Sequence, residues 1–193
     1  LASGLLEAIY SNIYPIVIGK YFSANDLGNY TRAQQFSNLP SSNVTGVLQR
    51  VTFPVLSSIQ NEDERLARNY RKILKLSAFL IFPLMQILSA VADPLIRVLL
   101  SDKWEGCIIL LQLLCFSLMW YPIQAINLNL LTVKGRSDLF FRLEVFKKII
   151  GVSIMVVTIP NGIIWMVSGG IVSSMISLII NTYYTGKLIN VGY

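Results

Sequence analysis

Residues 149–186 read IIGVSIMVVTIPNGIIWMVSGGIVSSMISLIINTYYTG and contain no charged side chain. A helix that crosses the hydrocarbon core of a bilayer needs roughly 20 mostly apolar residues. The stretch is therefore long enough for two crossings, provided that the first begins among the basic residues before Ile149. Pro160-Asn161-Gly162, near its middle, is a turn sequence that can join them. If Pro160 only kinked a single helix, the chain would have one crossing fewer.

The whole chain has the composition of a membrane protein. Of its 193 residues, 54% are apolar and 13% are charged, and the mean hydropathy is +0.60. The length rule predicts an all-α fold, a polytopic six-transmembrane-helix bundle, with spans at about residues 1–21, 30–59, 73–99, 105–133, 139–159 and 161–187. The first residues already belong to a span, and we expect the sequence to be a fragment of a longer protein.

The basic residues fall in every second gap between the uncharged runs. One gap holds Arg65, Arg68, Arg71, Lys72 and Lys75, and another holds Lys134, Arg136, Arg142, Lys147 and Lys148, whereas the other turns are nearly bare. Cytoplasmic loops of membrane proteins carry an excess of Lys and Arg. We therefore expect both basic loops, and with six spans both ends of the chain, to face the cytoplasm. No nucleic-acid partner is expected, because the net charge of +6 is concentrated in these topological signals.

Metal, cofactor and catalytic sites are not predicted. The chain has no His, and its two cysteines, Cys107 and Cys115, lie in one predicted span. Transition-metal sites need clusters of His, Cys or carboxylate ligands. The cysteines are therefore interpreted as small buried apolar residues.

The second predicted span is unusually polar for a helix in lipid. At helical spacing, Asn43, Gly46, Arg50 and Ser57 share one stripe, and Ser42, Thr45, Gln49 and Thr52 share the adjoining one. Arg50 lies about ten residues from the cytoplasmic end of this span, or roughly 15 Å, which is long for a side chain to reach the interface. Such a helix should face other helices or a water-filled cavity. Pro40 and Pro54 predict kinks in it.

Arg50 has two readings. Its permanently charged, planar guanidinium suits a phosphate or another anion. Alternatively, it pairs with an acid or with backbone carbonyls inside the bundle. In the fourth span, Gln124 and Asn127 either bond neighbouring helices or line a cavity. Coupling to protons or sodium would need a buried carboxylate, for which Glu7 and Asp93 are the candidates.

Several short stretches resemble the polysaccharide exporter branch of the multidrug/oligosaccharidyl-lipid/polysaccharide flippases. They are Ile18-Gly19-Lys20-Tyr21-Phe22, Leu27-Gly28-Asn29-Tyr30, the run from Arg50 to Gln60 (RVTFPVLSSIQ), Phe82-Pro83-Leu84, Lys103-Trp104 and Gly135-Arg136-Ser137-Asp138. Their order and spacing cover nearly the whole chain.

The resemblance implies that the chain is much of the second lobe of a two-lobe transporter in the bacterial inner membrane. Such a protein moves an undecaprenyl-pyrophosphate-linked oligosaccharide across the bilayer by alternating access, with the missing N-terminal lobe as partner. A cavity for this substrate needs cations for the pyrophosphate and amides or hydroxyls for the sugars. The candidate substrate-binding residues are Arg50, Asn43, Gln49, Thr45, Gln124 and Asn127.

Other function classes remain open at this point. A cation-coupled exporter of small drugs fits the same architecture, although a cationic drug would favour a carboxylate where this chain has Arg50. A membrane enzyme acting on prenyl phosphates would need paired carboxylates, a His base or a metal cluster, which the sequence lacks, and we expect no enzyme. A scaffold without transport activity is the remaining alternative.

Overall fold

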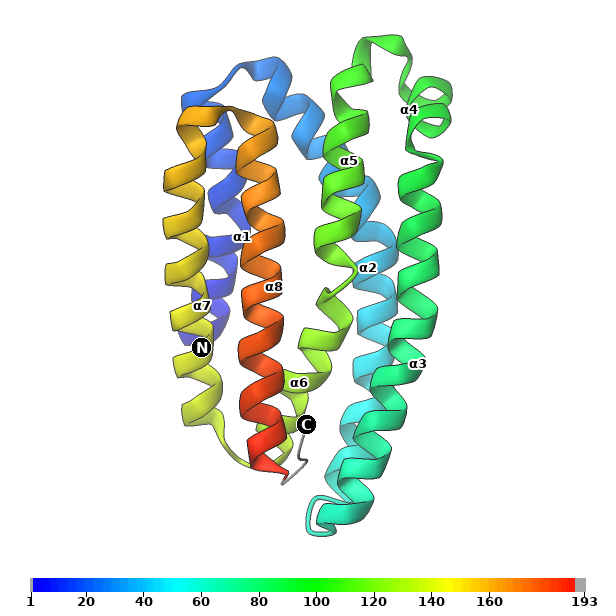
Figure 1. Cartoon of the computed structure of the whole chain (residues 1–193), viewed down its shortest axis with the longest axis vertical. Coiled ribbons are helices and arrows are strands. Elements are labelled where there is room, and N and C mark those ends of the chain that lie inside the picture. Colours follow the sequence, from blue (N-terminus) through cyan, green and yellow to red (C-terminus); the bar gives the residue numbers. More distant parts are fainter. Residues whose placement is uncertain (1, 190–193) are drawn as a thin grey trace.

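The chain folds into a bundle of long helices (Figure 1). This computed structural model describes the backbone of Ala2 to Ile189 and the side chains from Asn12 to Ile189. Throughout the described residues the regular elements are all helical, as the sequence predicts. They are α1 (Ala2–Tyr21), α2 (Ala24–Ser58), α3 (Asp63–Ala90), α4 (Ala92–Leu100), the 3-10 turn η1 (Asp102–Trp104), α5 (Glu105–Leu118), α6 (Tyr121–Val133), α7 (Ser137–Thr158), the 3-10 turn η2 (Ile159–Asn161) and α8 (Ile163–Leu188).

The long helices run up and down, and α5 continues into α6 after a break (Figure 1). Helix α2 packs against α3, α5 and α6 on one side of the bundle, while α8 packs against α7, α6 and α5 on the other. A core of buried side chains that includes Ile18, Ile81, Leu111 and Met166 fills the space between α1, α3, α5 and α8. Six membrane-length units therefore result, with α5 and α6 together forming one of them.

Two helices begin earlier than the predicted spans. Helix α2 begins six residues before residue 30, because Ser23 caps it: the Asp26 amide donates to Ser23 Oγ over 3.1 Å and the Ser23 amide donates to Asp26 Oδ2 over 3.1 Å. Helix α3 begins at Asp63 instead of residue 73, with Asp63 and Glu64 in a first turn where their charge suits the helix dipole. The basic residues after Arg65 therefore lie on a helix and not in a loop.

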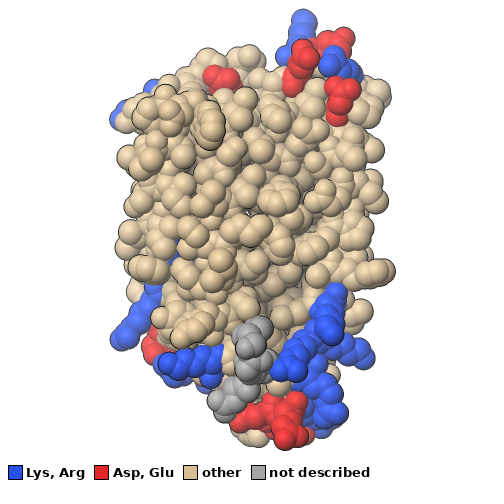
Figure 2. All heavy atoms as spheres, in the orientation of Figure 1, with Lys and Arg blue, Asp and Glu red and all other residues tan. Residues whose placement is uncertain are grey.

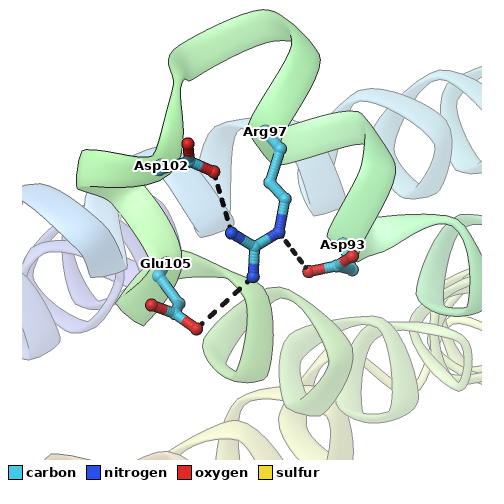
Figure 3. Close-up of polar contacts among 4 residues, drawn as sticks. All are labelled: Asp93, Arg97, Asp102 and Glu105. Carbon is cyan, nitrogen blue, oxygen red and sulfur yellow. Dashed lines mark hydrogen bonds and ion pairs between the residues drawn. The ribbon is translucent and has the colours of Figure 1, made fainter.

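The predicted third span, residues 73–99, is divided at Val91 into α3 and the short α4. Arg97 of α4 holds this corner together (Figure 3). Its Nε donates to Asp93 Oδ1 over 2.8 Å, one terminal nitrogen donates to Asp102 Oδ1 over 2.8 Å, and the other lies 3.4 Å from Glu105 Oε1. The Asp93–Arg97 pair, whose members lie four residues apart, thus extends to the start of α5. The three carboxylates raise the pKa of Arg97, Asp102 most strongly.

Charge and hydropathy show that the bundle is a multi-pass membrane protein. On the visible face, nearly all charged side chains gather at the two ends of the molecule and leave a broad uncharged belt (Figure 2). Among the described residues, three segments are long and apolar enough to cross a membrane: Asp63–Ala90, Asp102–Val133 and Ile163–Leu188. Large apolar side chains such as Phe79, Val98 and Val157 are more than 70% exposed, as a surface in contact with lipid requires.

We predict that Arg97 orders the corner formed by α4, η1 and α5. Arg97→Ala should accelerate hydrogen–deuterium exchange of the amides of residues 92–105, whereas Arg97→Lys, with one compact ammonium in place of the five-donor fork, should give an intermediate rate. Lys103→Ala is the matched control, because Lys103 lies in the same corner and forms no ion pair in the described part of the chain. Equal exchange in Arg97→Ala and Lys103→Ala would contradict this role.

Candidate functional site

The break between α5 and α6 brings polar groups together at the middle of the bundle. Pro122 has no amide hydrogen, so the carbonyl of Leu118, four residues earlier, loses its partner within the helix. The Ser41 hydroxyl of α2 donates to this carbonyl over 3.2 Å. A freed carbonyl in hydrocarbon must find such a donor, so this bond fixes which side of α2 faces the bundle.

Helix α8 forms hydrogen bonds to two further residues near the break. Ser174 Oγ donates to the Ser117 carbonyl over 3.1 Å. Gln124 Nε2 in turn lies 3.3 Å from the Ser174 carbonyl and 3.2 Å from Ser174 Oγ. Gln124, a predicted substrate contact, therefore joins α6 to α8.

Asn127 lies one turn further along α6 and is fully buried. Its Oδ1 accepts a hydrogen bond from the Tyr70 hydroxyl of α3, and its Nδ2 donates to Thr182 Oγ1 of α8 over 3.3 Å. Both ends of the amide are thus bonded to neighbouring helices. Of the two alternatives left open by the sequence, this geometry matches bonding between helices and leaves Asn127 no surface for a ligand, which corrects the cavity-lining expectation.

The polar stripes of α2 face in two directions. Thr45 is buried, and its hydroxyl donates to the Ser41 carbonyl over 2.7 Å. Gln49 is half-buried, whereas Asn43 and Arg50 are exposed. The stripe of Asn43 and Arg50 therefore faces away from the helices of this bundle, and Thr45 faces into them.

The exposed stripe is the candidate site, and we call it the α2 polar face. Its exposed polar members are Gln35, Asn38, Ser42, Asn43 and Arg50, with Gly46 half-buried between the last two and the apolar Leu39, Val47 and Val51 exposed beside them. In the described part of the chain Arg50 has neither an ion pair nor a hydrogen bond, so the internal pairing considered from the sequence is not present here. Helix α2 has 35 residues, enough to cross a bilayer, yet it is not among the three sufficiently apolar segments.

Arg50 lies towards the end of α2 that is joined to α3. Helices α2 and α3 form an antiparallel hairpin, so residues equally far from the turn at residues 59–62 lie at about the same height. Arg50 is thus level with Arg71, in a part of α3 that still carries basic side chains. The first exposed apolar position of that face is Leu76. Arg50 lies about 12 Å from the end of α2, and the exposed apolar side chains of Val51, Phe53 and Val55 lie between it and that end.

The sequence reasoning missed a charged cluster inside the bundle, formed by Glu144, Lys147 and Lys148 of α7. The Lys147 ammonium pairs with Glu144 Oε1, and Lys148 Nζ lies 3.7 Å from Glu144 Oε2. The three side chains are only 8% to 13% exposed. The prediction that Lys147 and Lys148 belong to a cytoplasmic loop is wrong, because α7 begins at Ser137 and they lie near its middle. The sequence signal for this cluster is that the two lysines follow Glu144 by three and four residues, which are spacings that allow ion pairs on a helix.

This cluster lies at the height of the α5–α6 break. Helices α7 and α8 are antiparallel around residues 159–162, so Lys147 is level with Ser174. Charged side chains at this depth of a transmembrane bundle often have a function in transport. Glu144 is thus a further candidate carboxylate for ion coupling. Asp93 lies at the exposed Arg97 corner, and the side chain of Glu7 is outside the described residues. No group of three or more metal-ligating side chains occurs in the described part.

Comparison with known proteins gives one family and several relatives. A family model described as "Polysaccharide biosynthesis protein" matches residues 1–109. The chain is 26% identical to the lipopolysaccharide biosynthesis protein WzxC of Escherichia coli, over 81% of this chain and 32% of that protein. It is 29% identical to the teichuronic acid biosynthesis protein TuaB of Bacillus subtilis, over 73% of this chain and 29% of that protein. The chain thus spans about a third of the length of these curated relatives.

The fold is also similar to solved transporter structures. The crystal structure of MATE in the straight conformation superposes with a TM-score of 0.87 at 16% sequence identity, over 98% of this chain and 44% of that one. At this identity the likeness shows the fold alone. It identifies the chain as a helical bundle equivalent to somewhat less than half of a longer polytopic protein.

We predict that the Ser41 bond at the break stabilises the bundle. Ser41→Ala should lower the free energy of unfolding by about 1 kcal/mol, because it leaves a buried carbonyl without a donor. Ser42→Ala is the matched control, since Ser42 is exposed and its hydroxyl bonds only to the Asn38 carbonyl of its own helix. Unfolding of both variants in detergent by denaturant would measure the difference, and equal losses would contradict the proposed role of Ser41.

We also predict strong coupling between Glu144 and Lys147. Glu144→Gln should destabilise the bundle by about 3 kcal/mol, because it removes the counter-charge of the buried Lys147. Adding Lys147→Met should restore part of that loss, since the double variant buries one unpaired charge fewer. A double-mutant cycle of unfolding free energies tests this, and purely additive losses would show that the two side chains do not interact.

Proposed function

The chain belongs to the polysaccharide biosynthesis protein family, and from this premise we propose that it is the second lobe of a lipid-linked oligosaccharide flippase. The complete protein would carry undecaprenyl-pyrophosphate-linked sugars from the cytoplasmic to the outer leaflet of the bacterial inner membrane. The lobe missing from this sequence would face the α2 polar face across a central, water-filled cavity, and both ends of the present chain would lie in the cytoplasm.

The observation that carries this proposal is the unpartnered, exposed guanidinium of Arg50 on a membrane-length helix. A charge at the surface of a transmembrane bundle is costly next to acyl chains but not next to water. The other exposed polar side chains of the α2 polar face are likewise more stable next to water than next to acyl chains. A wet cavity between two lobes would meet it for all of them.

The chemistry of the face fits the proposed substrate. A pyrophosphate carries oxygens that a guanidinium can bind with two parallel hydrogen bonds. Asn43 and Gln49 would offer amides to sugar hydroxyls, while buried Thr45 would act only by holding α2 in place. Arg50 lies towards the cytoplasmic end, so it would meet the headgroup at the leaflet where lipid-linked sugars are made and loaded.

The relatives support transport of this kind and not another. WzxC and TuaB are named for lipopolysaccharide and teichuronic acid biosynthesis, which are both cell-envelope polysaccharides. The likeness to MATE structures shows a shared fold and does not favour a multidrug substrate. A cationic drug would also be repelled by Arg50. We therefore propose no second function.

Replacing Arg50 in the complete protein tests the proposal. Arg50→Ala should lower polysaccharide export in a complemented null strain by roughly 10- to 100-fold, because a hydrogen bond to a charged group contributes about 1.5–3 kcal/mol. Arg50→Lys should retain part of the activity, since it keeps the charge without the planar fork. Surface glycan and lipid-linked intermediate would be measured at equal protein level.

Arg142→Ala is the matched control, because Arg142 is another exposed cation near the cytoplasmic end but lies on α7. Loss of export with accumulation of the intermediate in Arg50→Ala, and not in Arg142→Ala, is the expected result. Normal export by Arg50→Ala would remove Arg50 from the substrate path.

A further inference from the structure

Helix α3 carries four cations on one exposed face near the cytoplasmic end, visible as the blue cluster at the lower right of Figure 2. They are Arg68, Arg71, Lys72 and Lys75. Their side chains line a shallow groove of about 890 Å³, whose other lining residues are Asp63, Glu64, Ala67, Leu76 and Ile189. We call this feature the α3 basic groove. It is separate from the α2 polar face, which lies on another helix.

The four cations are distinguished from their neighbours by having no partner. In the described part of the chain they form no ion pair and no hydrogen bond, whereas three other basic residues of this end are paired. Arg65 pairs with Glu62, Lys134 with Asp63, and Arg136 with Asp138. The Arg136 guanidinium also lowers the pKa of Asp138. Asp138 is therefore already paired and does not neutralise the four cations of α3.

The four cations repel one another, and the two carboxylates that line the groove, Asp63 and Glu64, are too few to neutralise all four. Arg68 and Lys72, and also Arg71 and Lys75, are four residues apart, where like charges on a helix repel each other. Asp63, at the lower edge of the groove, is bound to Lys134 at 2.7 Å and is not available to them. Orientation in the membrane requires basic residues at this end, but it does not require them to share one unpaired face.

The same face becomes apolar immediately above the groove. Leu76 is 56% exposed, Phe79 is 81% exposed and Ile87 is 62% exposed, with Leu80 and Leu84 exposed between them. Along one helix face, cations are thus followed by a strip of exposed apolar side chains. A phospholipid has the same order, with its phosphate at the membrane surface and its acyl chains beneath it.

We infer that the α3 basic groove binds the headgroup of an anionic phospholipid of the cytoplasmic leaflet, whose acyl chains lie along the apolar strip from Leu76 to Ile87. The two arginines offer planar forks that suit phosphate oxygens, and the two lysines add positive charge. This site lies on the lipid-facing side of the lobe. It goes beyond the proposed transport function and holds whether or not that function is correct.

Lipid binding to the complete protein tests the inference without a transport assay. Native mass spectrometry would count adducts of phosphatidylglycerol and of the zwitterionic phosphatidylethanolamine. Arg68→Gln/Arg71→Gln/Lys75→Gln should weaken phosphatidylglycerol binding by on the order of 100-fold, because each basic residue near an anionic surface contributes about a fivefold gain in affinity. Phosphatidylethanolamine binding should not change.

The matched control is Arg65→Gln/Arg136→Gln/Arg142→Gln, which removes the same charge from the same end but leaves the groove intact. It should keep most phosphatidylglycerol binding, and so should the charge-preserving Arg68→Lys/Arg71→Lys, which also shows that the groove can be altered without unfolding. Equal loss in the two triple variants would reduce the effect to general charge attraction. Undiminished binding in the groove variant would also overturn the inference, because it would mean that the lipid sits elsewhere or that another part of the protein covers the groove.

Discussion

The fold depends on a requirement of the bilayer: a backbone carbonyl in the hydrocarbon has no water to bond and must find a donor within the protein. Pro122 creates such a carbonyl at Leu118, and Ser41 supplies the donor. This bond also fixes the rotation of α2. At 100° per residue, Arg50 lies on the opposite side of the helix from Ser41, and Asn43 lies close to that side. The polar face that we assign to the substrate is therefore turned outward by a bond made on the inward side.

The sequence alone predicts the architecture well because lipid imposes simple rules. Runs of apolar residues separated by clusters of basic residues predict the all-α membrane bundle, which the structure confirms. The same reasoning fails where charged residues that hydropathy assigns to loops form part of a hydrogen-bonded helix. Helix α3 continues through its charged first turns down to Asp63, and α7 contains Glu144, Lys147 and Lys148, because charges three and four residues apart can compensate each other within a helix.

Parts of the candidate site could not be predicted for a different reason. Gln124 and Asn127 take their partners, Ser174 and Thr182, from α8, some 50 residues away in the sequence. No local sequence pattern shows which polar side chains of two different helices will lie next to each other. Arg50 was recognisable as a charge within a predicted span, but its height became clear only from the α2–α3 hairpin, which makes it level with Arg71.

The cations of this chain have three kinds of surroundings, and these indicate different roles. Arg97 is paired with three carboxylates and holds a corner of the fold, and Lys147 is paired and buried in the bundle. Arg50 and the cations of the α3 basic groove are unpaired and exposed. Unpaired cations at the membrane surface of a protein favour anions from outside it. The two unpaired sets point in different directions, one towards the proposed cavity and the other towards lipid.

The central claim, that the α2 polar face lines a water-filled path, is tested most directly by labelling single cysteines with a membrane-impermeant maleimide. Cysteines at positions 43, 46 and 50 of the complete protein, with Cys107 and Cys115 replaced by Ser, would be compared with cysteines at positions 79, 80 and 87 on the apolar strip of α3. The account predicts rapid labelling of the α2 positions, slowed by lipid-linked oligosaccharide, and little labelling on α3. Equally slow labelling of both sets would show that α2 faces lipid or protein and would contradict it.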